Sequence, residues 1–225
     1  QSRNFDTGLG GDDQISADNG NNIVIGGYGS DALDMGTGDD IVLGDNGSLT
    51  FGDAGVMLQV ATTGPAVGGN DVIHAGDGNN IVLAGYGDDQ ASGGAGSDII
   101  LGDNGWVTQN AAGQRLQVES TDPATGGNDT LMGDGGDDVL IGGAKDDTLD
   151  GGAGTDVLLG DGGRVVYSAG FMQQAETIDL PVGGVDTLIG GAGHDYLFGG
   201  EGSDLLVGTL DEDTMLGEFG SVEFA

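Results

Sequence analysis

Aspartate recurs at every ninth position along most of this chain. Sixteen Asp or Asn residues stand at this spacing in four runs of four: Asp13, Asn22, Asp31 and Asp40; Asp71, Asn80, Asp89 and Asp98; Asp129, Asp138, Asp147 and Asp156; Asp186, Asp195, Asp204 and Asp213. The first members of successive runs are 58, 58 and 57 residues apart. Ca²⁺ prefers oxygen ligands, carboxylates among them, at about 2.3–2.6 Å. A regular file of carboxylates therefore predicts a row of calcium sites.

Glycine accompanies each aspartate at a fixed distance. If the aspartate is counted as position six of a nine-residue repeat, position four is glycine in fourteen of the sixteen repeats, and the exceptions are Lys145 and Asp211. Glycine tolerates the positive φ angles that tight turns require. Such turns aim backbone carbonyls inward, and carbonyls are further calcium ligands. We therefore expect positions one to six of each repeat to form a turn that binds metal.

An apolar residue follows each aspartate by two positions. Position eight is apolar in all sixteen repeats: Ile15, Val24, Leu33, Val42, Ile73, Val82, Ala91, Ile100, Leu131, Leu140, Leu149, Leu158, Leu188, Leu197, Leu206 and Met215. In a strand, successive side chains point to opposite faces. The pattern predicts a short strand at positions seven to nine, with position eight in a thin core.

The composition favours metal cations as partners. The 225 residues include 51 glycines, 38 acidic and 4 basic side chains, and the formal net charge is −34. Such a chain repels itself unless it is neutralised, and nucleic acid and anionic membranes are poor partners for it. No cysteine is present, which excludes disulfides and thiolate metal sites. No stretch of 18 apolar residues exists, so we expect no membrane span.

Sequence signatures of catalysis are lacking. The only histidines are His74 and His194, so the zinc motif H-E-x-x-H is absent. The sequence also contains no G-x-S-x-G nucleophile turn and no phosphate-binding loop in a helical context. We therefore expect no catalytic residues, and no cofactor other than calcium.

The nine-residue unit resembles a known repeat. Residues 93–101 read GGAGSDIIL, and residues 190–198 read GGAGHDYLF. This pattern, G-G-x-G-x-D-x-U-x, is similar to the calcium-binding nonapeptide of the repeats-in-toxin (RTX, haemolysin-type) family. The resemblance implies an all-β fold, a right-handed parallel β-roll (solenoid) of about eight coils. Two repeats would make one coil, with a strand on each side.

The resemblance also implies a ligand set for each ion. In that family an ion lies between turn n and turn n+2 and is bound by the position-six residues of both turns. Carbonyls at positions two and four of the first turn, and at positions one and three of the second, complete the set. The carbonyl ligands expected on this basis include Gly27, Gly29, Gly44, Asn46, Gly76, Gly78, Gly93, Ala95, Gly136, Gly151, Ala153, Gly191, Gly193, Gly208 and Leu210.

About fourteen calcium ions are expected, because sixteen turns form fourteen such pairs. Fourteen ions would bring 28 positive charges and reduce the net charge from −34 to −6. Without them the chain would have a thin core and strong self-repulsion, so we expect binding and folding to be coupled. Asn22 and Asn80 can offer only an uncharged oxygen, and their sites are expected to be weaker.

The repeats are interrupted at regular intervals. We expect a single repeat domain, residues 1–225, taken from a longer array. Its nonapeptide blocks are 8–47, 67–105, 125–163 and 182–220, its inserts are 48–66, 106–124 and 164–181, and a further insert starts at 221–225. Because each block holds four repeats, an even number, all inserts must leave from the same edge of the roll.

The first two inserts are expected to form β-hairpins. Predicted strands at 49–51 and 58–60 flank Gly-Asp-Ala-Gly, and strands at 107–109 and 116–118 flank Asn-Ala-Ala-Gly. The third insert, with expected strands at 165–167 and 171–172, matches this hairpin pattern less well. Successive inserts leave two coils apart, about 9.6 Å at ~4.8 Å per coil, which is also the span of two hairpin strands. We therefore predict that the hairpins join into an extra antiparallel layer.

One sheet of the predicted roll has an apolar outer face. Its strands carry large apolar residues at positions seven and nine: Ile23 and Ile25, Ile41 and Leu43, Ile81 and Leu83, Ile99 and Leu101, Val139 and Ile141, Val157 and Leu159, Tyr196 and Phe198. Such a stripe would promote aggregation in water. Since the hairpins follow these strands directly, our preferred hypothesis is that they cover the stripe. The alternative is that the stripe serves self-assembly or binds a partner.

The resemblance leads to three hypotheses for function. The first is a calcium-binding structural segment of a secreted or cell-surface protein, such as an adhesin, a surface-layer protein or a toxin. Proteins of this kind leave Gram-negative bacteria unfolded by type I secretion and fold outside the cell, with calcium ions and the neighbouring repeats of the parent chain as partners. The second is an accessory module of a secreted protease, lipase or epimerase. The third is a module that binds a ligand or further copies through its hairpins. The long array favours the first.

Overall fold

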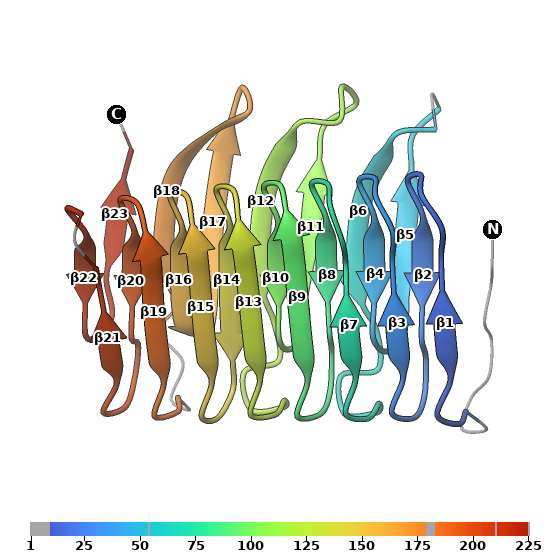
Figure 1. The fold of residues 1–225 in the computed structure, drawn as a ribbon, viewed down its shortest axis with the longest axis horizontal. Helices are drawn as coiled ribbons and strands as arrows, with labels where there is room; N and C mark the ends of the chain where they lie inside the picture. Colours follow the sequence, from blue (N-terminus) through green and yellow to red (C-terminus); the bar gives the residue numbers. More distant parts are fainter. Residues whose placement is uncertain (1–9, 54, 179–182, 210, 225) are drawn as a thin grey trace.

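Stacked β-strands make up the computed structural model, which describes residues 10–53, 55–178, 183–209 and 211–224; these residues contain no helix. Two parallel sheets of eight strands each run side by side along the molecule (Figure 1). A seven-stranded antiparallel sheet packs against the outside of the second parallel sheet. The expected all-β parallel roll of eight coils, with a hairpin layer added from one edge, is confirmed.

Each coil contributes one strand to each parallel sheet. The first sheet contains, in spatial order, β1 (Gln14–Ser16), β3 (Ala32–Asp34), β7 (Val72–His74), β9 (Gln90–Ala95), β13 (Thr130–Gly135), β15 (Thr148–Ala153), β19 (Thr187–Ala192) and β21 (Leu205–Val207). The second contains β2 (Ile23–Ile25), β4 (Ile41–Leu43), β8 (Ile81–Leu83), β10 (Ile99–Leu101), β14 (Val139–Gly143), β16 (Val157–Asp161), β20 (Tyr196–Phe198) and β22 (Thr214–Leu216). Equivalent repeat positions pair in register, for example Leu33 with Ile73.

The position-eight side chains fill the space between the two parallel sheets. From Val24 to Leu197 every one of them is buried. In the outermost described coils Ile15 and Leu206 are only partly buried, and Met215 is 50% exposed. Each strand therefore gives the core a single side chain, so apolar burial per repeat is small.

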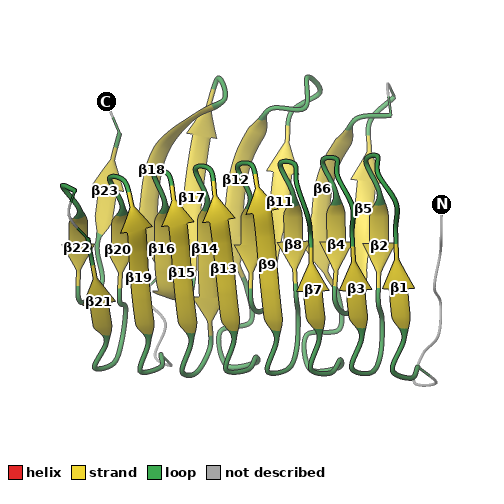
Figure 2. Cartoon of the chain, in the orientation of Figure 1, coloured by secondary structure: helices red, strands yellow, loops and turns green. Residues whose placement is uncertain are grey.

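The inserts form the third sheet, which Figure 2 shows behind the roll. Its strands, in spatial order, are β23 (Ser221–Glu223), β18 (Phe171–Thr177), β17 (Gly163–Ser168), β12 (Arg115–Ser120), β11 (Gly105–Gln109), β6 (Met57–Thr62) and β5 (Gly47–Phe51). Neighbouring hairpins pair through β6 with β11 and β12 with β17, so the layer is continuous, as predicted. Its first hairpin strands start at Gly47, Gly105 and Gly163, one residue before the expected insert boundaries.

The apolar stripe is covered by the hairpin sheet. Val60, Val107, Val118, Val165 and Ala175 of that sheet are fully buried in one cluster with the outward residues of the second parallel sheet. At the N-terminal end of the stripe Ile23 is 46% exposed. The preferred hypothesis is thus confirmed over most of the stripe.

The third insert forms a hairpin as regular as the other two, so treating it as a poorer match was wrong. β17 and β18 pair over six positions, from Gly163 with Thr177 to Ser168 with Phe171. Ala169 and Gly170 between them both have positive φ, 53° and 84°. Two consecutive positive φ angles are typical of the tight turns that join hairpin strands. Alanine at the first of these positions gives no turn signal in the sequence.

Candidate metal centres

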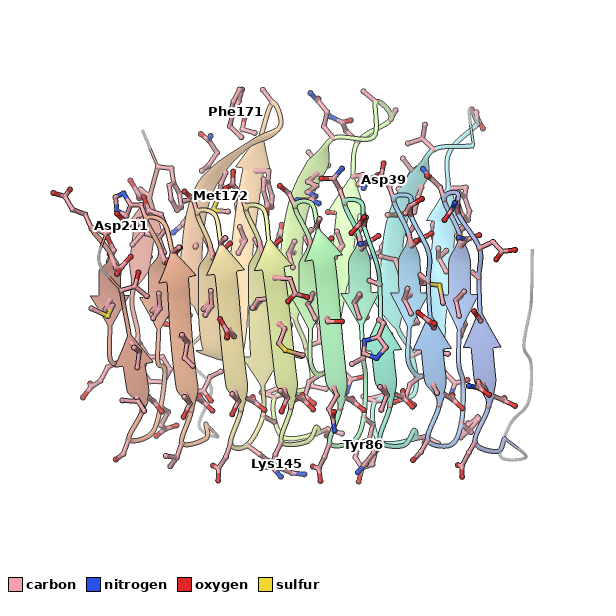
Figure 3. The ribbon with its side chains drawn as sticks, viewed as in Figure 1. Asp39, Tyr86, Lys145, Phe171, Met172 and Asp211 are labelled. Atoms are coloured by element: carbon pink, nitrogen blue, oxygen red, sulfur yellow. The ribbon has the colours of Figure 1, made fainter. Side chains whose placement is uncertain are left out.

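The turns of the roll stack in two rows. The hairpin edge, at the bottom of Figure 1, is the row of turns that lead into the first parallel sheet: those of Asp13, Asp31, Asp71, Asp89, Asp129, Asp147, Asp186 and Asp204. The plain edge, at the top, is the row that leads into the second sheet: the turns of Asn22, Asp40, Asn80, Asp98, Asp138, Asp156, Asp195 and Asp213. Figure 3 shows Tyr86 and Lys145 on the hairpin edge and Asp39 and Asp211 on the plain edge. The fold thus brings the sixteen position-six residues into two files.

From the second described coil onward, Oδ1 of each position-six residue accepts a hydrogen bond from the preceding coil. The backbone N–H of Asp71 donates to Oδ1 of Asp89 (2.7 Å), and that of Asp98 donates to Oδ1 of Asp138 (2.7 Å). The same bond joins successive coils along the whole of both edges. The position-six side chains therefore hold the coils in register, whatever else they bind.

In most of these aspartates the other carboxylate oxygen has no hydrogen bond. Within the described residues, Oδ2 is buried and unpartnered in twelve of the position-six aspartates: Asp31, Asp40, Asp71, Asp89, Asp98, Asp129, Asp138, Asp147, Asp156, Asp186, Asp195 and Asp204. A buried carboxylate oxygen without a compensating group is strongly unfavourable. A cation at each of these oxygens would provide that compensation.

A backbone carbonyl of the next turn lies beside most of these oxygens. A methyl group added to Gly142 would overlap both Oδ2 of Asp147 and the carbonyl oxygen of Gly160, which is position one of the next turn. The same is found on the hairpin edge at Gly26, where a methyl group would overlap Oδ2 of Asp31 and the carbonyl of Gly44. Glycine at position one thus leaves a cradle lined by a carboxylate and a carbonyl oxygen, the donor chemistry that calcium takes.

The turns also have the backbone conformation that the predicted carbonyl ligands require. Positive φ occurs at those of positions two and four: Gly27, Gly29, Gly76, Gly78, Gly136, Gly191 and Gly193. Lys145 adopts a φ of 76° where other repeats have glycine. Predicted carbonyls at positions one and three, such as Gly44 and Ala95, accept one backbone N–H each, which leaves a second lone pair. Leu210 lies outside the described residues.

Burial raises the pKa of these carboxyl groups. Desolvation is the largest cause, and it raises the pKa of Asp71 to about 7, those of Asp89 and Asp138 to about 8, and that of Asp147 to about 11. Neighbouring carboxylates add to the effect, for example Asp129 beside Asp147. The ionised form of each group is therefore unfavourable in the fold unless a positive charge accompanies it.

At Asn80 an amide nitrogen takes the place of the unpartnered oxygen. Its Nδ2 donates to the carbonyls of Gly76 (3.0 Å), Gly93 (3.2 Å) and Gly78 (3.4 Å). Its Oδ1 accepts the N–H of Asp40, as an aspartate Oδ1 does elsewhere. These three carbonyls are members of one predicted ligand set, and the amide shows that they converge on one point.

A second group of aspartates was not recognised from the sequence. Asp45 accepts the N–H of Gly69, on the far side of its insert, and the N–H of Tyr86 on the next coil. Asp103 and Asp161 repeat the arrangement at the other two inserts. All three are buried with both carboxylate oxygens bonded, so they close the base of each hairpin, although burial still raises the pKa of Asp45 and Asp103 to about 8 and that of Asp161 to about 6. The sequence feature that could have identified these aspartates is the tripeptide Leu-Gly-Asp, which recurs every 58 residues at the insert boundaries.

The described residues contain no cluster of three or more His, Cys, Asp or Glu side chains arranged to hold a metal. An ion bound in the turns must therefore take much of its coordination from backbone carbonyls. In the same described ranges, no helix is long and apolar enough to cross a membrane.

Comparison with known proteins identifies the repeat. The family model of the RTX calcium-binding nonapeptide repeat matches four stretches, residues 7–42, 66–90, 132–164 and 182–215, which together exceed half of the chain. None of the curated proteins compared with the chain matches it.

Proposed function

This chain belongs to the RTX calcium-binding nonapeptide repeat family, and on that premise we propose that it is a structural module that folds when calcium fills the turns along both edges of the roll. The observation that carries the proposal is the row of buried Oδ2 atoms that have no partner among the described residues. They recur coil after coil, always at position six, which a solvated turn aspartate would not do. The carboxylate and carbonyl oxygens of these turns are the ligand types that calcium prefers.

Each ion would lie between two successive turns of one edge. Asp138 and Asp156, for example, would supply the carboxylates of one site. Gly136, Gly151 and Ala153 would supply carbonyls to it. Bound calcium would provide the positive charge that these buried carboxylates lack, and it would reduce the net charge of −34. Since the core holds one side chain per strand, binding and folding should be a single event.

We further propose that the module belongs to a secreted or cell-surface protein, with an adhesin or surface-layer protein preferred, and that it folds after type I secretion. Calcium sites of extracellular modules have dissociation constants of about 10⁻⁴–10⁻³ M, which keeps such a chain unfolded inside the cell. Its blocks and inserts would form one repeat domain. A role of the apolar stripe in self-assembly loses support, because the hairpin sheet covers it.

A calcium titration followed by circular dichroism and native mass spectrometry tests the proposal. The metal-stripped chain should lack β-structure and gain it cooperatively as many ions bind. Mg²⁺ is the matched control, because it demands octahedral geometry at about 2.0–2.1 Å and should not replace calcium. A chain that is fully folded in excess chelator at neutral pH, or that binds only one or two ions, would contradict the proposal.

A further inference from the structure

Asn80 interrupts the file of aspartates on the plain edge. It lies between Asp40 and Asp98 and is completely buried, at 0% exposure. Both neighbours have a buried Oδ2 with no partner in the described part of the chain. At Asn80 the corresponding atom is a donor, Nδ2, and its N–H groups point to the carbonyls of Gly76, Gly78 and Gly93.

The three carbonyls come from two different turns. Gly76 and Gly78 are positions two and four of the turn of Asn80, and Gly93 is position one of the next turn on the same edge. A cation between these turns would need the oxygen lone pairs that the amide engages. It would also lie against the positive end of the amide dipole, where an aspartate would offer negative charge.

Asn22, two turns earlier on the same edge, is only partly buried and makes two of these three contacts, both within its own turn. Its Nδ2 donates to the carbonyls of Asp18 (2.9 Å) and Gly20 (2.5 Å), which are positions two and four of its turn. Its backbone N–H donates to Oδ1 of Asp40. The coil-to-coil bond is thus retained while the metal-facing atom becomes a donor.

We propose, building on the calcium-binding function above, that Asn22 and Asn80 are internal substitutes for a calcium ion. The amide of Asn80 joins the two turns of the pair Asn80/Asp98, the amide of Asn22 engages carbonyls of its own turn in the pair Asn22/Asp40, and these two pairs take no metal. The pair Asp40/Asn80 keeps a site, because Oδ2 of Asp40 is buried and unpartnered. Twelve of the fourteen turn pairs then bind calcium. The sequence predicted weaker sites at Asn22 and Asn80, whereas this proposal predicts that the two sites are absent.

This assignment makes the two edges different. The hairpin edge has aspartate at all eight positions, whereas both amides lie in the first four turns of the plain edge. The N-terminal half of the plain edge should therefore depend less on calcium than the rest of the roll.

Native mass spectrometry in saturating calcium tests the assignment, because it counts ions on each folded chain. Asn80→Asp should bind one more Ca²⁺ than the parent, and Asn22→Asp combined with Asn80→Asp should bind two more. Asn70→Asp is the charge control. Asn70 is exposed at position five of the hairpin edge, and its Oδ1 accepts the N–H of Asp88 as an aspartate oxygen would. This control should keep the parental count.

A reverse variant keeps the test decisive if Asn80→Asp does not fold. Asp138→Asn should stay folded and lose one ion, since its amide can close the turn pair Asp138/Asp156. An unchanged ion count in Asn80→Asp, or in Asp138→Asn, would overturn the assignment. A parent chain that binds almost no calcium would instead refute the proposed function, so the two failures are distinguishable.

Discussion

The backbone N–H of Asp129 donates a 2.8 Å hydrogen bond to Oδ1 of Asp147 on the next coil of the hairpin edge. Oδ2 of the same Asp147 is buried and has no partner among the described residues. One carboxylate thus has two separable roles, since one oxygen sets the spacing of the coils and the other faces the proposed ion. Substitutions that affect the roles differently can therefore be used to separate them.

Removing the whole carboxylate should abolish both roles. We predict that Asp147→Ala weakens both calcium sites that it shares, with Asp129 and with Asp186, and lowers the calcium count by one or two. It should also cost about 1–3 kcal/mol in the unfolding free energy of the calcium-loaded chain, because the buried N–H of Asp129 is left without an acceptor. Chemical denaturation in saturating calcium gives the energy, and native mass spectrometry gives the ion count. Asp77→Ala removes the same charge from an exposed turn position and should change neither quantity appreciably.

Filling the cradle should weaken calcium binding while leaving the carboxylate in place. We predict that Gly142→Ala raises the calcium concentration at the folding midpoint, because its methyl group would overlap Oδ2 of Asp147 and the carbonyl of Gly160. Ala84 and Met35 occupy this repeat position in the turns of Asp89 and Asp40, so we expect a weaker site and not a lost one. Gly135→Ala is the matched control, since no atom lies within 4 Å of its added methyl group. Alanine already stands at the equivalent position in Ala95 and Ala153. Equal folding midpoints for Gly142→Ala and Gly135→Ala would show that the cradle does not hold the ion.

Acid should partly replace calcium. Burial raises the pKa of Asp71 to about 7 and those of Asp89 and Asp138 to about 8, whereas an aspartate in an unfolded chain titrates near 3.9. Because the folded-state pKa values are the higher ones, the folded state binds more protons, and the metal-free fold loses stability as the pH rises from about 4 to about 8. We predict that the metal-stripped chain gains β-structure by circular dichroism when the pH is lowered from 8 to 5.

Calcium binding should respond to the same protons. Protons compete with calcium for the carboxylates of the folded chain, whereas the unfolded chain stays ionised between pH 6 and 8, so the number of calcium ions bound at the folding midpoint should decrease, without an increase in the calcium concentration at that midpoint, as the pH falls from 8 to 6. A metal-free chain with the same β-content at pH 5 and pH 8 would mean that these carboxyl groups are not the ones that oppose folding.

Much of the architecture could be predicted because the repeat has a constant length of nine residues. The apolar residue at position eight of each repeat identifies the core, and the even number of repeats per block places every hairpin on one edge. What could not be predicted depends on atoms that meet only in the folded chain. Asp45 contacts Gly69 and Tyr86 only after the insert has closed. The amide of Asn80 likewise has a role only once carbonyls from two turns converge on it.

The aspartates at the hairpin bases should be needed for closing the inserts. Asp103 accepts the N–H groups of Gly127 (3.0 Å) and Ala144 (2.6 Å), one on each carboxylate oxygen. We predict that Asp103→Asn costs about 1–3 kcal/mol, because an amide can accept only one of the two bonds and turns a donor toward the other N–H. Hydrogen exchange should show lost protection at Gly127 and Ala144, with an unchanged calcium count. Asp122→Asn, an exposed position of the same insert, is the control and should leave both unchanged.

The hairpin sheet should depend on the apolar stripe that it covers. Leu101 on β10 is 1% exposed and packs in the cluster shared with Val107 and Val118 of the second hairpin. We predict that Leu101→Ala lowers the unfolding free energy of the calcium-loaded chain by about 2–5 kcal/mol, the range for a buried leucine whose site collapses only partly. Leu116→Ala on β12 removes the same atoms from a side chain that is 40% exposed, and it should cost about 0.5 kcal/mol or less. In Leu101→Ala, hydrogen exchange should accelerate in β11 and β12 before it does in the strands of the first parallel sheet, because the stripe contacts the hairpins and not that sheet. Equal acceleration in both sheets would indicate instead that the roll and its hairpin layer unfold as one unit.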